Sequence, residues 1–130
     1  MNGEGFRADV RQFILDFIDS VEKMEVLLLL ERESARAWSA EEVAVELRTT
    51  AASAAARLED LSAAGILESI GDSPRRHQLA SADPALRELF GAVAHTYRER
   101  RVAVITLIYS RPPDAVRELA RAFRLRKDDG

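Results

Sequence analysis

Apolar residues recur at helical spacing near both ends of the chain. Residues 6–19 carry a phenylalanine-rich stripe that is typical of an amphipathic helix covered by another element. Ser20 is placed to cap a second helix that runs to about Glu33. Asp83, as a cap, and Pro84, in the first turn, predict the start of another amphipathic helix. The pattern therefore predicts helices on both sides of a central module.

The central module begins with the clearest helix start in the chain. Ser39 and Glu42 have the spacing of a capping box, in which each side chain bonds the backbone N–H of the other residue. The helix that follows is short, and Thr50 offers a second cap after it. Residues 51–64 are nearly all good helix formers, and Gly65 is a typical stop. A short helix followed, after a tight turn, by a longer helix over residues 51–64 is therefore expected.

Two short apolar-polar segments follow this helix pair. Residues 66–70 and 75–79 have strand character, and the Gly-Asp-Ser-Pro sequence of residues 71–74 separates them. This arrangement predicts a β-hairpin. The expected fold class is mainly α with a small β-hairpin.

The segment 102–109, VAVITLIY, is apolar on all sides and suits either a buried strand or a buried helix. No turn signal separates it from Tyr97, which favours continuation of the preceding helix. A helix that is apolar on every face requires burial on every face, so a partner is expected, most simply a second copy of the chain. A last amphipathic helix with a basic face is predicted over residues 114–126.

The length of 130 residues fits one domain, residues 1–130. Its expected parts are an N-terminal helix at 6–19, a central module at 20–80 and C-terminal helices at 83–126. The order of elements from 20 to 80, which is helix, short helix, turn, helix, glycine and hairpin, is that of a winged helix-turn-helix.

The central module also resembles bacterial regulators of the MarR, PadR and ArsR type. The resemblance is carried by the segment RLEDLSAAGIL at residues 57–67, in which a pair of leucines, a glycine and an aliphatic pair end a recognition helix and begin a wing. It implies flanking N- and C-terminal dimerisation helices and a homodimer. The apolar residues expected at the dimer interface are Phe13, Phe17, Tyr97, Val104, Ile105, Ile108 and Phe123.

The same resemblance implies a bacterial-type transcriptional regulator that binds double-stranded DNA. Because the sequence shows neither a signal peptide nor a membrane span, the expected location is the cytoplasm. The second helix of such a motif lies in the major groove, and the wing contacts the backbone. Hydroxyl groups and arginines are the side chains suited to those contacts. The residues expected to bind DNA are Thr49, Thr50, Ser53, Arg57, Arg75, Arg76 and His77.

The charge distribution supports an alternative. Residues 39–64 hold two basic and five acidic side chains, whereas residues 95–130 hold nine basic and five acidic ones. Phosphate neutralisation supplies most non-specific affinity for DNA, and the helix pair has few cations to contribute. A winged-helix module that binds a regulatory protein and has little DNA affinity is therefore the second hypothesis.

The sequence lacks the residues that a metal site, a catalytic site or a membrane span would need. The chain has no cysteine and two histidines in different elements, so neither a metal nor another cofactor is expected. No arrangement of a nucleophile with a base or of paired carboxylates indicates an enzyme. No segment has the length of a membrane span or the pattern of a signal peptide. For the aromatic residues, helical spacing favours core packing over an effector pocket.

Overall fold

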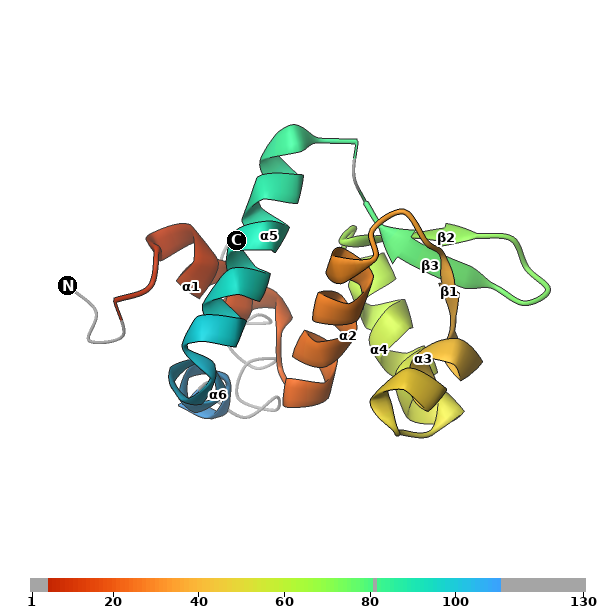
Figure 1. Cartoon of the computed structure of the whole chain (residues 1–130), viewed down its shortest axis with the longest axis horizontal. Coiled ribbons are helices and arrows are strands. Elements are labelled where there is room, and N and C mark those ends of the chain that lie inside the picture. Colours follow the sequence, from red (N-terminus) through yellow and green to blue (C-terminus); the bar gives the residue numbers. More distant parts are fainter. Residues whose placement is uncertain (1–4, 81, 111–130) are drawn as a thin grey trace, which may run out of the picture.

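The computed structural model describes residues 5–80 and 82–110 of the chain. Within these ranges it contains six helices and a three-stranded antiparallel sheet (Figure 1). None of the described helices combines the length and apolar character needed to cross a membrane. In chain order the elements are α1 (Ala8–Phe17), α2 (Val21–Arg32), β1 (Trp38–Ser39), α3 (Ala40–Leu47), α4 (Ala51–Ala63), β2 (Leu67–Ile70), β3 (Arg76–Leu79), α5 (Pro84–Glu99) and α6 (Arg101–Ser110).

The predicted helix boundaries of the central module are confirmed by their caps. Ser39 Oγ accepts a hydrogen bond from the Glu42 N–H at 3.2 Å, and Glu42 Oε1 accepts one from the Ser39 N–H at 2.9 Å. Thr50 Oγ1 accepts one from the Ser53 N–H at 3.0 Å. Gly65 has a φ of 81°, the left-handed conformation that ends a helix. Local side-chain chemistry thus fixes where α3 and α4 begin and where α4 ends.

The sheet has one strand more than the predicted hairpin. Its order is β1-β3-β2, so β3 is the central strand, and Trp38 and Ser69 both lie opposite His77. The hairpin prediction was incomplete because β1 has only two residues, too few to show an alternating pattern, and its Ser39 also caps α3. This strand fixes the base of the wing formed by β2 and β3 against the start of α3.

One hydrophobic core joins the central module to the terminal helices. Phe13 of α1 packs against Phe90 of α5 with 5.9 Å between ring centroids. Leu27 and Leu30 of α2 and Leu58 of α4 are fully buried in the same core. In Figure 1, α2 runs through the middle of the molecule, with α5 and α6 on one side and α3, α4 and the sheet on the other.

The prediction that residues 102–109 are helical is confirmed, but the predicted continuation of the preceding helix is wrong. The helix breaks at Arg100, whose φ of −134° and ψ of 50° are not helical. Its guanidinium lies 5.0 Å from the centroid of the Phe6 ring, near the N-terminus. The break lets α6 turn and pack against α1, a tertiary contact that no local pattern indicates.

The new helix α6 is only partly buried. Val104, Leu107 and Ile108 enter the core, but Val102 is 79% exposed and Tyr109 is also exposed. The expected burial on every face is therefore not met within the described chain. The predicted helix at residues 114–126 lies outside the described residues.

Candidate nucleic-acid interface

The outer face of α4 carries mostly small, apolar side chains. Its inner face is anchored by Ala54, Leu58 and Leu61, all of which are buried. Helical periodicity places Ala52, Ala56 and Glu59 on the opposite side, where all three are exposed. The centre of the surface that a groove would meet therefore consists of methyl groups and one carboxylate.

The polar groups predicted on α4 lie on its flank and face α2. Thr49 Oγ1 donates to Glu22 Oε2 at 2.8 Å, and the Ser53 hydroxyl donates to Glu22 Oε1. Arg57 Nε donates to the same oxygen at 3.2 Å. Three of the seven residues predicted to bind DNA thus converge on one carboxylate.

Glu22 was not found by sequence reasoning. It lies in the first turn of α2, at least 27 positions before its partners, and no spacing rule links residues so far apart. The hydrogen bond from Ser53, together with those from Thr49 and Arg57 and the charge of Arg57, lowers the pKa of Glu22 against the opposing effect of burial. The side chain is therefore a carboxylate at neutral pH.

The turn between α3 and α4 is more accessible. Thr50 is exposed, although its hydroxyl also caps α4. Arg48 is exposed as well and has a φ of 58°, a left-handed conformation at a non-glycine residue. The next residue, Thr49, closes the turn, because its backbone N–H donates a hydrogen bond to the Ala44 carbonyl oxygen at 2.9 Å. The turn thus offers one exposed cation, Arg48, beside the exposed Thr50.

The two predicted wing arginines differ in their surroundings. Arg75 precedes β3, and its side chain is 59% exposed, with a single long contact of 3.3 Å from Nη2 to Asp72. Arg76, on β3, donates from Nη1 to Glu42 Oε1 at 2.6 Å and is half-buried. Arg75 is the more available of the two for an external anion.

His77 lies inside the fold, and the structure does not support its predicted contact with DNA. His77 is only 5% exposed, and its Nδ1 atom lies 2.9 Å from Ser62 Oγ. Burial, and to a lesser extent the charge of Arg75, lowers the pKa of His77, whereas Glu59 acts in the opposite direction. The ring is thus a neutral packing element at the base of the wing.

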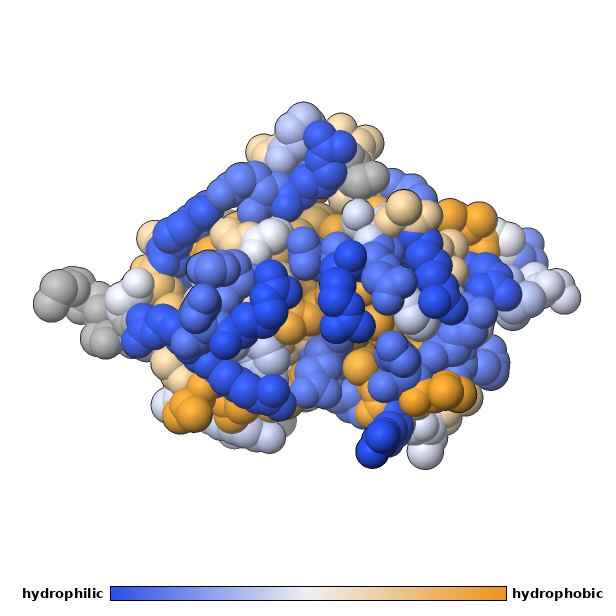
Figure 2. Space-filling model, in the orientation of Figure 1, coloured by the Kyte–Doolittle hydropathy of each residue, from blue (hydrophilic) through white to orange (hydrophobic). Residues whose placement is uncertain are grey.

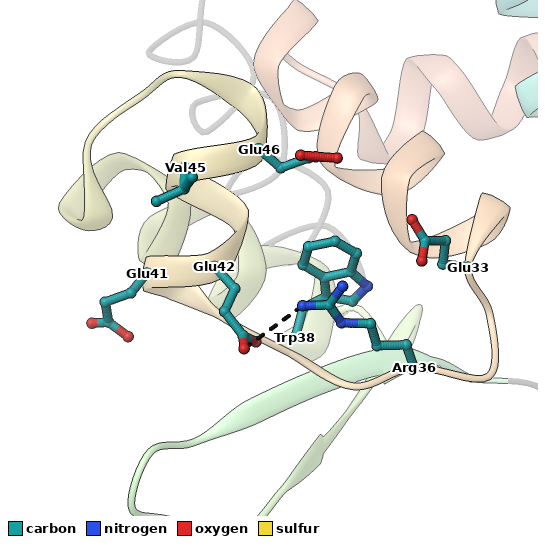
Figure 3. A pocket seen from close by; sticks show the side chains of 7 residues that line it. All are labelled: Glu33, Arg36, Trp38, Glu41, Glu42, Val45 and Glu46. Carbon is teal, nitrogen blue, oxygen red and sulfur yellow. Dashed lines mark ion pairs between the residues drawn. The ribbon is translucent and has the colours of Figure 1, made fainter.

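The outer face of α3 forms an acidic hollow of about 400 Å³ (Figure 3). The Arg36 guanidinium lies 3.6 Å from the centroid of the Trp38 ring and 3.7 Å from a Glu42 oxygen. Val45 is 80% exposed beside it. Four carboxylates against one cation make this face unsuited to phosphate. The lining residues are Glu33, Arg36, Trp38, Glu41, Glu42, Val45 and Glu46.

Most residues predicted at the dimer interface lie in the chain's own core. Phe13, Tyr97, Val104 and Ile108 are buried in the single chain, because α1, α5 and α6 cover one another. Phe17 is exposed, Ile105 is partly buried against the core, and Phe123 lies outside the described residues. The sequence pattern could not tell burial within the chain from burial between chains.

No protein-family model and no curated protein sequence matches the chain. Solved structures do. MepR, a transcription regulator of the Staphylococcus aureus multidrug efflux pump MepA, is 16% identical, with 92% of this chain and 85% of that chain covered and a TM-score of 0.52. A mutant S. aureus MepR bound to an oligodeoxyribonucleotide is 14% identical, with coverages of 92% and 85% and a TM-score of 0.51. Transcriptional regulator Tm0710 from Thermotoga maritima is 13% identical, with coverages of 92% and 82% and a TM-score of 0.50.

The chain has a MarR-like winged-helix fold. The fold class predicted from the sequence is thereby confirmed. In this MarR-like arrangement α3 and α4 correspond to the helix-turn-helix pair, α4 has the position of the helix called the recognition helix in such folds, and β2 and β3 form the wing. The likeness covers nearly the whole chain, so it includes the terminal helices as well as the central module.

Proposed function

We propose that the protein is a DNA-binding regulator of transcription that acts as a homodimer in the bacterial cytoplasm. The observation that carries the proposal is the exposed outer face of the recognition helix in a winged-helix fold. Ala52 and Ala56 let the backbone of α4 approach base edges closely, and alanine methyl groups suit contact with the methyl group of thymine. A structural neighbour with the same fold, a MepR mutant, is bound to an oligodeoxyribonucleotide.

In this proposal the wing and the turn before α4 supply the contacts to phosphate. Arg75 and Arg48 are exposed cations, and Thr50 is an exposed hydroxyl. Arg76 is shared with Glu42, and His77 is not included. Few cations per subunit mean a modest non-specific affinity, which a homodimer would raise by doubling the contacts.

The exposed apolar side chains of the terminal helices support the homodimer. Phe17 on α1 and Val102 and Tyr109 on α6 are large, hydrophobic and exposed. Figure 2 shows hydrophobic surface over α6 at the lower left of an otherwise mostly hydrophilic face. Sedimentation equilibrium should give a dimer for the wild type and a larger monomer fraction for Val102→Glu. A monomer for the wild type would contradict this part of the proposal.

Binding to a random-sequence duplex, followed by fluorescence anisotropy, tests the DNA proposal. Affinity should fall steeply with salt, and Arg75→Ala should weaken it about fivefold and reduce the salt slope by about one per subunit. Arg87→Ala is the matched control because Arg87 is an exposed arginine on α5, away from the wing. Absence of binding at low salt, or equal losses for the two variants, would contradict the proposed function.

The acidic hollow on α3 supports a second candidate function, recruitment of a protein partner through a basic segment. An aromatic ring with carboxylates around it is a recognition site for guanidinium groups, and Arg36 covers the buried Trp38 ring, so an incoming guanidinium would have to compete with Arg36. Trp38 is the single tryptophan of the chain, so its fluorescence reports on this hollow. An arginine-rich peptide should change that fluorescence, and less so for Glu46→Gln than for the wing control Glu68→Gln. An unchanged signal at low salt would rule this candidate out.

A further inference from the structure

The flank of α4 contains a preformed oxyanion site, which the Glu22 carboxylate of the same chain occupies. Two hydroxyl groups and one guanidinium surround the Glu22 carboxylate, with donors at 2.8 Å from Thr49 and 3.2 Å from Arg57 and a third from Ser53. Hydroxyl and arginine donors are also the groups that proteins use to bind DNA phosphates. The anion in this site comes from α2, whereas the donors belong to the recognition helix and the turn before it.

Arg57 is the member of this site that is free to change partners. It contacts Glu22 through Nε, and its two terminal nitrogens make no hydrogen bond to any described residue. Its side chain is 31% exposed, so water reaches the pair. An ion pair of this kind is weak enough for a second anion to compete with it.

The charges around α4 indicate what Arg57 and Glu22 each do when a phosphate approaches. A duplex that approaches the outer face of α4 brings phosphates toward a helix that already carries the exposed Glu59. Without Arg57, α4 has no cation of its own, because Arg57 is the only basic residue between Ala51 and Ala63. The Glu22 carboxylate both occupies Arg57 and adds a like charge next to the incoming phosphate.

We propose that Thr49, Ser53 and Arg57 form a phosphate site on the recognition helix that Glu22 occupies in the DNA-free chain, and that a DNA backbone phosphate takes Arg57 from Glu22. This inference rests on the proposed function. It makes Glu22 an internal competitor that holds down the affinity for DNA. It also explains how a recognition helix that is so poor in exposed donors can still contact the backbone.

A double-mutant cycle on a random-sequence duplex at low salt tests the inference. Glu22→Gln keeps one oxygen that accepts from one of the two hydroxyls and replaces the other oxygen by an NH2 group that donates to the second hydroxyl, and it removes the charge that holds Arg57. We expect it to bind DNA about fivefold more tightly per subunit than the wild type, the scale of one partly exposed ion pair. Arg57→Ala should cost less than about twofold in the wild type, where the phosphate contact of Arg57 is offset by the loss of its pair with Glu22, and should abolish the whole gain in the Glu22→Gln background.

Glu59→Gln is the matched charge control, because it removes one carboxylate from the exposed face of α4 without touching Arg57. The gain from Glu22→Gln must exceed that from Glu59→Gln and must disappear with Arg57→Ala. Thermal unfolding of each variant shows whether α4 stays packed.

The outcomes separate the inference from the proposed function. If the wild type binds DNA and Glu22→Gln binds equally or more weakly, the inference is wrong and Glu22 instead positions Arg57. An equal loss from Arg57→Ala in both backgrounds would lead to the same conclusion. If neither the wild type nor Glu22→Gln binds the duplex, the proposed function fails and the inference fails with it.

Discussion

The recognition helix and the wing hold their arginines in opposite ways. On α4, Arg57 is half-buried and tied to Glu22 from another helix, whereas Arg75 at the wing has only a long contact to Asp72 three residues away. The buried face of α4 anchors it in the core, whereas β2 is buried only at Leu67. The comparison shows that neighbours from distant parts of the chain, in addition to the residue type, decide how accessible each arginine is to an external anion.

The same comparison separates two sources of stability. The position of α4 depends on the hydrophobic core and on the Glu22 contacts, so a change at α4 should affect the whole molecule. The tip of the wing depends on its own turn, so a change there should remain local. The predictions below test this difference in order of expected effect.

The largest expected effect comes from the buried face of α4. Leu58→Ala should lower the free energy of unfolding by about 3 kcal/mol, because Leu58 is fully buried and its truncation leaves a cavity. Ile70→Ala, at the exposed end of β2, should cost less than about 1 kcal/mol. Urea unfolding of both variants measures the difference. Similar losses would show that the wing is as strongly coupled to the core as α4.

A smaller effect is expected at Gly65, where α4 ends and the wing begins. An added Cβ at Gly65 meets no atom within 4 Å, so Gly65→Ala tests only the positive φ of 81° and should cost about 1 kcal/mol. Gly91→Ala is the matched control, because Gly91 lies inside α5 and its added Cβ would come no closer than 3.9 Å to a Glu31 oxygen. That variant should gain about 0.5 kcal/mol or more from helix propensity. Changes of the same sign in both variants would contradict the conformational argument.

Local chemistry explains how much of the fold the sequence predicts. The Ser39–Glu42 pair, Thr50 and Gly65 act within one or two turns of their own position, so their spacing alone places α3, α4 and the start of the wing. The break at Arg100 accompanies the packing of α6 against α1, a tertiary contact that is not encoded within a short window. Boundaries set by caps are therefore predictable, and those set by packing are not.

In the candidate site, too, local features are predictable from the sequence and contacts between distant residues are not. The sequence indicates the hydroxyls and arginines of the α4 segment and the wing, because their types and positions are visible in it. It does not show that Glu22 takes three of them or that Glu42 takes Arg76, because those partners lie 27 to 35 positions away. Nor does it show that His77 points inward, since that follows from the central place of β3 in the sheet.

The smallest expected effect concerns the pH dependence of the base of the wing. Burial lowers the pKa of His77 below its ordinary value of 6.5, so around that pH the unfolded chain binds more protons than the folded chain. Stability should therefore be full above this value, fall as the pH drops through 6.5 toward the folded-state pKa, and level off below it. Urea unfolding of the wild type and of His77→Gln on both sides of this window measures the contribution, because the variant should lack that part of the pH dependence.

His95→Gln serves as the control for the histidine prediction, since it makes the same substitution at the other histidine, which is exposed on α5. The comparison with α4 makes this test informative, because Arg75 and Glu59, the charged groups that act on His77, come from the wing and from the recognition helix. Arg75→Ala should weaken the pH dependence, since it removes a cation that disfavours protonation, and Glu59→Gln should strengthen it. If both variants match the wild type, burial alone sets the behaviour of His77, and the wing and α4 are electrostatically independent at this point.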